Sequence, residues 1–247
     1  MKYILSQMIP GTQLSCVEIG GSSIETVLFG PDGSVQRVDG AVRPEGSRLA
    51  IASPGLIGGG RVLGAANLGW FDVDPAEALA LGETAEVLLN DAEAAALGES
   101  ALRDGVDLVF ICVGTGVGGA VVSGGQVVAG NLLGHIDGFS DKACSCGRVG
   151  CLETVAAGWA LPEPLSADDV DRMAMAIASA LAREATATER LVVIGGGIAR
   201  RYPRLCERLS ANAPSRRVES SLAPDGYKSA AAWGLRQALE GSSIMQS

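Results

Sequence analysis

Four potential metal ligands fall within one short stretch of the sequence. The chain has six cysteines and a single histidine, and this stretch contains the histidine with three of the cysteines: His135, Cys144, Cys146 and Cys151. Three thiolates and one imidazole form a tetrahedral donor set that suits Zn²⁺, and four protein ligands leave no position open for water. Gly147 and Gly150 allow the chain to fold back so that the sulfurs converge. The sequence therefore predicts a structural zinc site.

Two other interpretations of these cysteines are less favoured. A disulfide needs an oxidising compartment, and the beginning of the chain does not resemble an export signal, because Gln7 and Pro10 interrupt its apolar run. A redox-active pair has the spacing C-x-x-C, whereas a single residue separates Cys144 from Cys146. We therefore expect a cytoplasmic protein whose thiols bind a metal ion.

Three glycine-rich segments are candidates for binding phosphate groups. They contain Gly20, Gly21 and Ser22, then Gly114, Thr115, Gly116 and Gly118, and finally Gly195, Gly196 and Gly197. Without a Cβ atom, the backbone N–H groups of such turns can approach an anion closely, and consecutive donors form a concave anion site. None of the segments has the lysine of the G-x-x-x-x-G-K-[ST] phosphate loop. The alternatives are two tight hairpin turns and an ordinary strand-to-helix connection.

Asp91 is the candidate catalytic base. It follows an apolar strand and begins an alanine-rich helix, so its carboxylate could face a cleft and take a proton from a substrate hydroxyl. Asparagine and aspartate are also preferred N-caps of helices, and either Asn90 or Asp91 would serve as one. The local sequence favours capping and leaves the catalytic role open.

The elements that must position these residues repeat one pattern in each half of the chain. Three predicted strands open the first half and form an antiparallel meander: 16–20, 24–30 and 48–55. In the second half, a strand at 108–114 and two strands within 120–130, separated by a turn, repeat the meander, and a further strand follows at 190–197. Helices are predicted at 91–103, 166–185, 198–210 and 228–241. Two halves that each present a glycine-rich β-turn suit a protein that holds a phosphate chain between two domains.

The composition excludes two classes of partner. The 247 residues include 28 acidic and 19 basic ones, for a formal net charge of −9. Binding of a polyanion needs clustered lysine and arginine to replace counterions, so no nucleic-acid partner is expected. No apolar run reaches the roughly 18 residues of a membrane-spanning helix, so no membrane partner is expected either.

Several segments together resemble one protein family, the ROK family of bacterial sugar kinases and sugar-responsive repressors. The matching segments occur in the family's order: EIGGSS, SPG, NLGW (67–70), NDAEAAALGE (90–99), GTGVGGAVV, GHI with CSCGRVGCLE, and VIGGGIA. The resemblance implies an α/β protein with two RNase-H-like domains around a cleft, the actin/hexokinase-like ATPase fold, with the zinc-bearing loop in the second domain. The implied domains are 1–104 with a C-terminal helix at 235–247, and 105–234.

The resemblance also implies an activity, the ATP-dependent phosphorylation of a hexose, amino sugar or cyclitol hydroxyl, with Asp91 as general base. The residues implied to contact the sugar are Asn67, Asn90, Asp91, His135 and Glu153. ATP with Mg²⁺ is implied to lie between the first two glycine turns, with Glu18 on the Mg²⁺ side and Gly195–Gly197 at the adenosine. A homodimer is expected, since family members are often dimers.

Two residues and two short connections depart from the family pattern. Glu18 stands where the first turn usually begins with aspartate, and Leu132 stands where a sugar-binding glutamate usually precedes the zinc histidine. The chain has no room for a helix between Val35 and Ala50, and its helical segment between Glu153 and Leu191 is reduced. These departures motivate an alternative function, a catalytically impaired relative that acts as a sugar- or nucleotide-binding sensor or partner subunit. A repressor is not expected, because no helix-turn-helix precedes the first strand.

Overall fold

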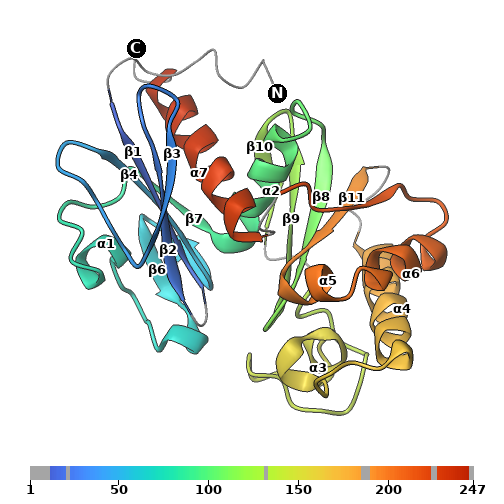
Figure 1. Ribbon diagram of the computed structural model, residues 1–247. Helices are drawn as coiled ribbons and strands as arrows, with labels where there is room; N and C mark the ends of the chain where they lie inside the picture. The colour runs from blue at the N-terminus through green and yellow to red at the C-terminus, as the bar shows by residue number, and fades with distance from the viewer. Residues whose placement is uncertain (1–11, 21–22, 131–132, 185–189, 224–226, 245–247) are drawn as a thin grey trace. The chain divides into compact units, whose positions relative to one another are not determined.

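Two compact units make up the chain in the computed structural model, which describes residues 12–20, 23–130, 133–184, 190–223 and 227–244. One unit comprises Met1–Asp104 together with Lys228–Ser247, and the other comprises Gly105–Tyr227. Each unit is built around a mixed five-stranded sheet (Figure 1).

The sheet of the first unit has the strand order β3-β2-β1-β4-β7. Its strands are β1 (Leu14–Ile19), β2 (Ile24–Phe29), β3 (Val35–Asp39), β4 (Arg48–Ser53) and β7 (Val87–Asn90). The first three pair antiparallel, whereas β4 lies parallel to β1 and β7 lies parallel to β4. The expectation that 48–55 is the third strand of the meander is therefore wrong. That place belongs to β3, a short, mostly exposed strand whose polar residues gave no strand signal.

The sheet of the second unit repeats this order as β10-β9-β8-β11-β12. Its strands are β8 (Leu108–Val113), β9 (Val117–Ser123), β10 (Gln126–Ala129), β11 (Leu191–Gly195) and β12 (Val218–Ser220). Again an antiparallel meander comes first, and β11 and β12 then add in parallel to β8. The short strand β12 was not predicted, because three residues carry too little periodicity to recognise.

The helices of at least eight residues are α2 (Asp91–Ala101), α4 (Ala167–Arg183), α6 (Arg204–Asn212) and α7 (Tyr227–Ile244). The short ones are α1 (Pro75–Ala78), α3 (Glu153–Ala156), α5 (Gly197–Arg201), and the 3₁₀ turns η1 (Ala66–Leu68) and η2 (Gly158–Ala160). The single helix expected at 198–210 is in fact two, α5 and α6. Pro203 separates them, because proline cannot donate the backbone hydrogen bond that would continue the first helix and also restricts the residue before it.

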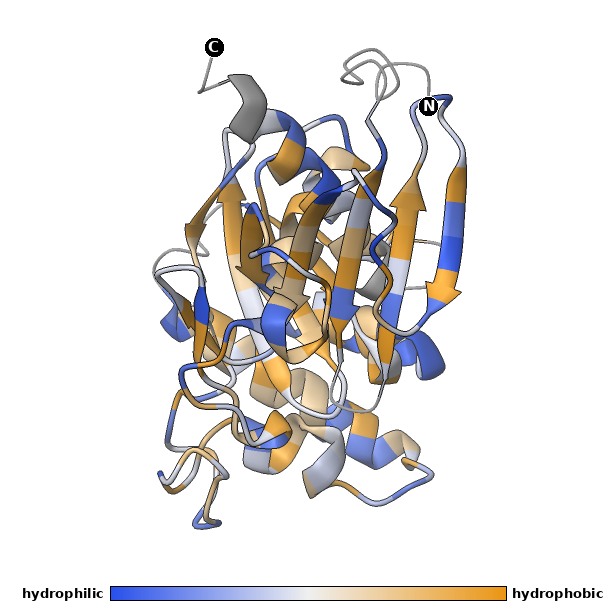
Figure 2. Ribbon diagram, turned by 90° about the vertical axis from the view of Figure 1, so that its left-hand side faces the viewer, coloured by the Kyte–Doolittle hydropathy of each residue, from blue (hydrophilic) through white to orange (hydrophobic). Residues whose placement is uncertain are grey.

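Apolar residues of the strands form the core of each unit (Figure 2). In the second unit, alternate residues of β8 and β11, such as Val109, Ile111 and Ile194, pack with Met173 and Ile177 of α4 and with residues of α6. In the first unit, the segment that contains η1 and α1 covers one face of the sheet. Along the chain, this segment comes after a small hairpin of β5 (Leu56–Gly58) and β6 (Arg61–Gly64).

Helices α2 and α7 approach each other through small residues in the first unit. A Cβ atom on Gly98 would lie 1.8 Å from the carbonyl oxygen of Ala230, and one on Gly234 would lie 1.8 Å from the carbonyl oxygen of Ala94. This contact extends along α7, and the first unit accordingly takes in the helix from Lys228 onward. The boundary expected from the sequence, between residues 234 and 235, lies inside α7.

The connection between β3 and β4 contains no helix, as its length predicts: residues 40–47 follow an irregular path. Among the described residues, no helix is both long enough and apolar enough to cross a bilayer.

Candidate functional site

Among the described residues of the first unit, Gly20, Asn90 and Asp91 lie at the carboxyl ends of its parallel strands. Ser53, at the end of β4, lies opposite Asn90 at the end of β7, and β1 ends beside β4 at Ile19. In open α/β sheets, ligands bind outside the carboxyl ends of such strands. The topology therefore places the first glycine turn, the Ser53-Pro54-Gly55 turn and the start of α2 along one edge.

Asn90 is the N-cap of α2. Its Oδ1 accepts a hydrogen bond of 2.9 Å from the backbone N–H of Ala92, and its own backbone N–H donates to Glu93 at 3.4 Å, which completes a capping box. The Nδ2 group of Asn90 donates to the carbonyl oxygen of Gly55 at 3.0 Å. One side chain thus starts the helix and joins it to the turn after β4.

Asp91 is therefore the first residue inside the helix. Of the two residues that the sequence offered as the cap, the structure selects Asn90. The half-buried carboxylate of Asp91 accepts from the N–H of Ala92 at 2.9 Å and lies at the positive end of the helix dipole, which favours the ionised form. The neighbouring Glu93 has its pKa raised by burial and by the charge of Asp91.

The first glycine turn is described in part. Gly20 donates to the carbonyl oxygen of Ser23 at 2.8 Å, which closes the connection between β1 and β2. Gly21 and Ser22 lie outside the described residues. Glu18 is 2% exposed on β1, and its Oε1 lies 3.6 Å from where a Cβ on Gly20 would stand. The Glu18 carboxylate is thus buried beside the turn.

Asn67 lies on η1, where its side chain is exposed. This segment is held by backbone hydrogen bonds between Ala65 and Trp70. Along the chain, it comes directly after the β5–β6 hairpin, which follows the Ser53-Pro54-Gly55 turn.

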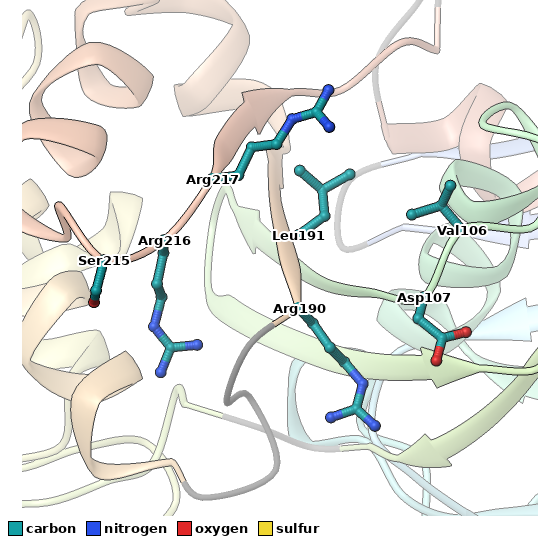
Figure 3. A pocket seen from close by; sticks show the side chains of 7 residues that line it. All are labelled: Val106, Asp107, Arg190, Leu191, Ser215, Arg216 and Arg217. Atoms are coloured by element: carbon teal, nitrogen blue, oxygen red, sulfur yellow. The ribbon is translucent and has the colours of Figure 1, made fainter.

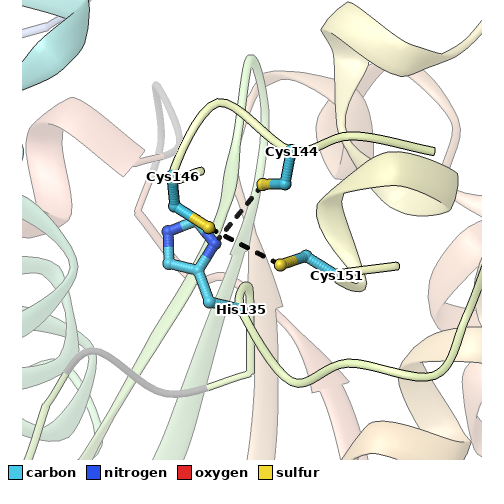
Figure 4. Close-up of side chains that lie close together, drawn as sticks. All are labelled: His135, Cys144, Cys146 and Cys151. Carbon is cyan, nitrogen blue, oxygen red and sulfur yellow. Dashed lines mark hydrogen bonds between the residues drawn. The ribbon is translucent and has the colours of Figure 1, made fainter. Parts of the chain in front are cut away.

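In the second unit, the four potential metal ligands come together (Figure 4). Their ligand atoms all lie within 4.8 Å of one another. The Sγ of Cys144 is 3.7 Å from Nδ1 of His135, and the Sγ atoms of Cys146 and Cys151 are 3.6 Å apart. Ligand atoms around tetrahedral zinc, with bonds of about 2.0–2.3 Å, are separated by about 3.5–3.8 Å. Both the donor set and its spacing therefore fit a zinc ion.

The backbone of the loop makes this convergence possible. Gly147 has φ +85° and donates to the carbonyl oxygen of Cys144 at 3.0 Å, which closes a tight turn. Gly150 has φ +77°, and a Cβ there would lie 2.5 Å from the carbonyl oxygen of Ser140. Both positions need glycine for the reason that the sequence suggested.

The thiols of the cluster differ in acidity. Burial alone would raise the pKa of Cys146, but hydrogen bonds from the backbone and side chain of Arg148 hold it at about 7. Burial, together with the thiols of Cys146 and Cys144, raises the pKa of Cys151 to about 12. A cation is needed to keep all three sulfurs ionised at once. Arg148 was not among the residues predicted from the sequence, although a single basic residue between two ligand cysteines indicates a group that can stabilise a thiolate.

The second glycine turn is shorter than its sequence suggests. It consists of Gly114, Thr115 and Gly116, with Gly114 donating to the carbonyl oxygen of Gly116 at 2.9 Å. Gly118 already belongs to β9, where it pairs with Cys112 of β8. Thr115 is exposed.

Glu153 contacts this turn from the start of α3. Its side chain is 9% exposed, and its Oε1 accepts a hydrogen bond of 2.7 Å from the backbone N–H of Val117. A Cβ on Gly116 would lie 2.5 Å from this oxygen, so Gly116 leaves the space that the carboxylate occupies. The sequence predicted Glu153 as a sugar-binding residue and did not indicate its hydrogen bond with Val117.

The third glycine segment lies beside the second turn. Gly195 ends β11 opposite Cys112, Gly196 has φ +97°, and Gly197 begins α5. A Cβ on Gly114 would lie 3.9 Å from the N–H nitrogen of Gly197. Both segments therefore occupy the carboxyl edge of β8 and β11. Leu132, the departure next to the metal loop, lies outside the described residues.

A pocket at the opposite edge of this sheet is lined by arginines (Figure 3). Its residues precede or begin β8, β11 and β12: Val106, Asp107, Arg190, Leu191, Ser215, Arg216 and Arg217. Arg217 pairs with Glu219, and Arg216 donates to the carbonyl oxygen of Leu181. None of the sequence-predicted site residues lines it.

Comparison of the sequence with known proteins finds one family. The profile described as "ROK family" matches residues 38–169. An N-acetylmannosamine kinase of Escherichia coli O1:K1 is 37% identical over 180 residues, which cover 58% of this chain and 60% of the relative. The chain thus spans less than two thirds of the length of such relatives.

Solved structures match over nearly the whole chain. A ROK hexokinase from Thermus thermophilus superposes with a TM-score of 0.72 at 24% identity, covering 93% of this chain and 100% of the other. A ROK family glucokinase from Streptomyces griseus, solved with glucose and AMPPNP, also gives a TM-score of 0.72, at 20% identity, covering 91% and 98% of the two chains. At these identities the likeness establishes the α/β fold of ROK sugar kinases.

Proposed function

Since the chain belongs to the ROK family, we propose that it is an ATP-dependent kinase that phosphorylates a hydroxyl of a sugar or sugar-like substrate, with Asp91 as general base. The observation that carries the proposal is that Asn90 and Asp91 have different roles at the start of α2. Asn90 caps the helix, so the carboxylate of Asp91 is not needed as the cap and is held at the strand edge by its place in the first turn.

Asp91 would accept the proton of the attacking hydroxyl. A positioned general base contributes roughly 10²–10⁴-fold in rate. The carboxylate lies at the positive end of the helix dipole, and a carboxylate is a form that can accept a proton. Asn67, Asn90, His135 and Glu153 are proposed to bind the sugar hydroxyls.

The glycine segments would hold the nucleotide. Backbone N–H groups of Gly20–Ser22 and Gly114–Gly118 are proposed to bind phosphate oxygens, and Gly195–Gly197 to lie at the adenosine. Mg²⁺ bound with ATP supplies neutralisation of the charge on the transferring phosphoryl group, and Glu18 is the carboxylate proposed on its side. The position of Glu18 beside Gly20 supports this role.

His135, Cys144, Cys146 and Cys151 would hold a structural zinc ion. Zinc bound there supplies a fixed crosslink between the ends of the loop. The Nδ1 atom of His135 faces the sulfurs, and its other ring nitrogen points away from them (Figure 4). That second nitrogen is proposed to donate to a sugar hydroxyl, with its direction set by the metal bond.

The substrate class rests on the relatives. N-Acetylmannosamine and glucose are the first candidates, because relatives are described as N-acetylmannosamine kinases and a glucokinase. The test measures ADP release by zinc-loaded protein across a panel of hexoses, N-acetylated amino sugars and cyclitols. Sugar-dependent ADP release with at least one of them is expected. Its absence with every sugar, in a folded and zinc-loaded sample, would overturn the proposal.

The second candidate is a catalytically impaired relative that binds sugar or nucleotide as a sensor or partner subunit. It is favoured by Glu18, because the longer side chain is confined in a buried site and cannot move freely to a Mg²⁺ ion. Calorimetry would separate the two candidates: ligand binding without turnover supports this one. Replacing Glu18 by aspartate would then be expected to restore turnover.

A further inference from the structure

We propose that Glu153 is a positioning residue that connects the metal-binding loop to the second glycine turn, so that metal occupancy sets the conformation of that turn. The consequence for nucleotide binding rests on the proposed kinase function. The connection itself rests on contacts within the second unit.

The first step is a brace between two segments that each carry a metal ligand. Gly134 and Ile136 flank His135, and Leu152 and Glu153 follow Cys151. The N–H of Glu153 donates to the carbonyl oxygen of Gly134 at 3.0 Å, and the N–H of Leu152 donates to that of Ile136 at 2.8 Å. A metal ion bound by the side chains of His135 and Cys151 would fix the same two segments a second time.

The second step is the contact of this braced pair with the turn. Glu153 accepts the N–H of Val117 at 2.7 Å, and a Cβ on Gly134 would lie 2.0 Å from the carbonyl oxygen of Val117. Both polar groups of Val117 therefore lie against residues within two positions of a metal ligand. Farther along the same segment, Gly158 donates to the carbonyl oxygen of Gly114 at 2.8 Å.

The third step concerns the strength of the connection. The hydrogen bond from Val117 goes to a buried carboxylate, and bonds to charged groups are shorter and stronger than neutral ones. If the loop loses its metal ion, the brace keeps only its two backbone bonds. The carboxylate can then shift, and the Gly114–Val117 turn loses the acceptor that orders it.

The experiment is hydrogen–deuterium exchange of the full-length protein, followed in peptides that cover Val117. The samples are zinc-loaded wild type, chelator-treated wild type, Glu153→Ala and Glu153→Gln. Glutamine keeps an acceptor oxygen for the N–H of Val117, whereas alanine removes it. We expect exchange at Val117 to accelerate by about 10- to 100-fold in Glu153→Ala and in the metal-free protein, and by much less in Glu153→Gln.

Helix α6, which lies in the same unit as Glu153, serves as the internal control. Unchanged protection there shows that a variant is folded. If Glu153→Ala is unfolded by this measure, the proposal is tested by comparing exchange at Val117 in the metal-free wild type and in Glu153→Gln. Exchange at Val117 that does not change on metal removal, or that does not change in Glu153→Ala, overturns the proposal. Because this readout needs no turnover, its failure is distinct from a failure of the kinase function, which would leave the exchange pattern intact. ATP affinity, measured by calorimetry, is expected to weaken several-fold in Glu153→Ala.

Discussion

At the scale of residues, neighbouring side chains at a strand end divide the tasks of folding and chemistry. The side-chain oxygen of Asn90 accepts from the N–H of Ala92 and its amide donates to the carbonyl oxygen of Gly55, whereas the carboxylate of Asp91 accepts from the N–H of Ala92. The sequence offered both as caps. The choice between them depends on which residue has extended backbone angles, and Asn90 does, with φ −64° and ψ 147°. Local sequence could not decide this.

This division predicts that two adjacent substitutions have unequal effects on stability. Asn90→Ala removes the cap, at about 1 kcal/mol, and a hydrogen bond to Gly55, at about 1 kcal/mol more. The melting temperature is expected to fall by roughly 4–8 °C. Asp91→Asn is expected to change it by less than about 2 °C. Calorimetric melting of both variants checks the prediction, which a larger loss in Asp91→Asn than in Asn90→Ala would contradict.

The residue types of the histidine–cysteine cluster could be predicted from sequence more fully than the glycine turns. A lone histidine and three cysteines specify one donor set wherever the loop goes, and their ligand atoms do converge. A run of glycines does not specify where a turn ends, and Gly118 accordingly proved to be a strand residue. The contact of Glu153 with Val117 joins residues far apart in sequence, so no local pattern could reveal it.

At the scale of elements, the crossing of α2 and α7 depends on small residues on both helices. The backbone of α2 at Ala94 and Gly98 lies against the backbone of α7 at Ala230 and Gly234. The sequence predicted both helices from their alanine content, but their crossing could not be predicted because the two segments lie at distant points of the chain. Short elements also escaped prediction: β3 is polar, and Pro203 divides a helix whose pattern is otherwise continuous.

Gly98→Ala is expected to separate the two helices. The new methyl group would lie 1.8 Å from the carbonyl oxygen of Ala230 and 3.0 Å from the nitrogen of Gly234, and neither backbone atom can move without shifting α7. Overpacking of this kind costs roughly 1–3 kcal/mol or more. Gly241→Ala is the matched control, because a Cβ there meets nothing within 4 Å. Alanine is the better helix former by about 1 kcal/mol, so the control is expected to be neutral or stabilising.

Denaturant unfolding of the two glycine variants measures the difference. A Gly98→Ala protein as stable as Gly241→Ala would show that the helices do not touch where the structure places them.

At the scale of the whole molecule, one arrangement of strands is used in both units. Each has an antiparallel meander followed by two parallel strands, and each presents a glycine turn between its first two strands. The sequence indicated the repeated meander, because the alternation of apolar runs and turns recurs. The parallel strands that complete each sheet pair with residues far away in the chain, and their direction could not be inferred locally.

The metal ion is expected to be an integral part of the second unit. Purified protein should contain about one zinc per chain, measured by plasma mass spectrometry, and chelation should lower the melting temperature, because metal that binds only the folded state stabilises it. Cys151→Ser should reduce the zinc content strongly. Cys206→Ser is the control, since Cys206 is a free, half-buried thiol of α6 outside the cluster. Equal zinc loss in both variants would refute the assignment of ligands.

The most direct test of the proposed function is the rate at which wild type and Asp91→Asn form sugar phosphate from ATP. The product is detected by mass spectrometry at saturating sugar, in zinc-loaded samples with matched melting temperatures. We expect product from the wild type and a rate lower by about 10²–10⁴-fold in Asp91→Asn. Equal rates in the two proteins would contradict it, since the carboxylate at the start of α2 would then take no part in the chemistry.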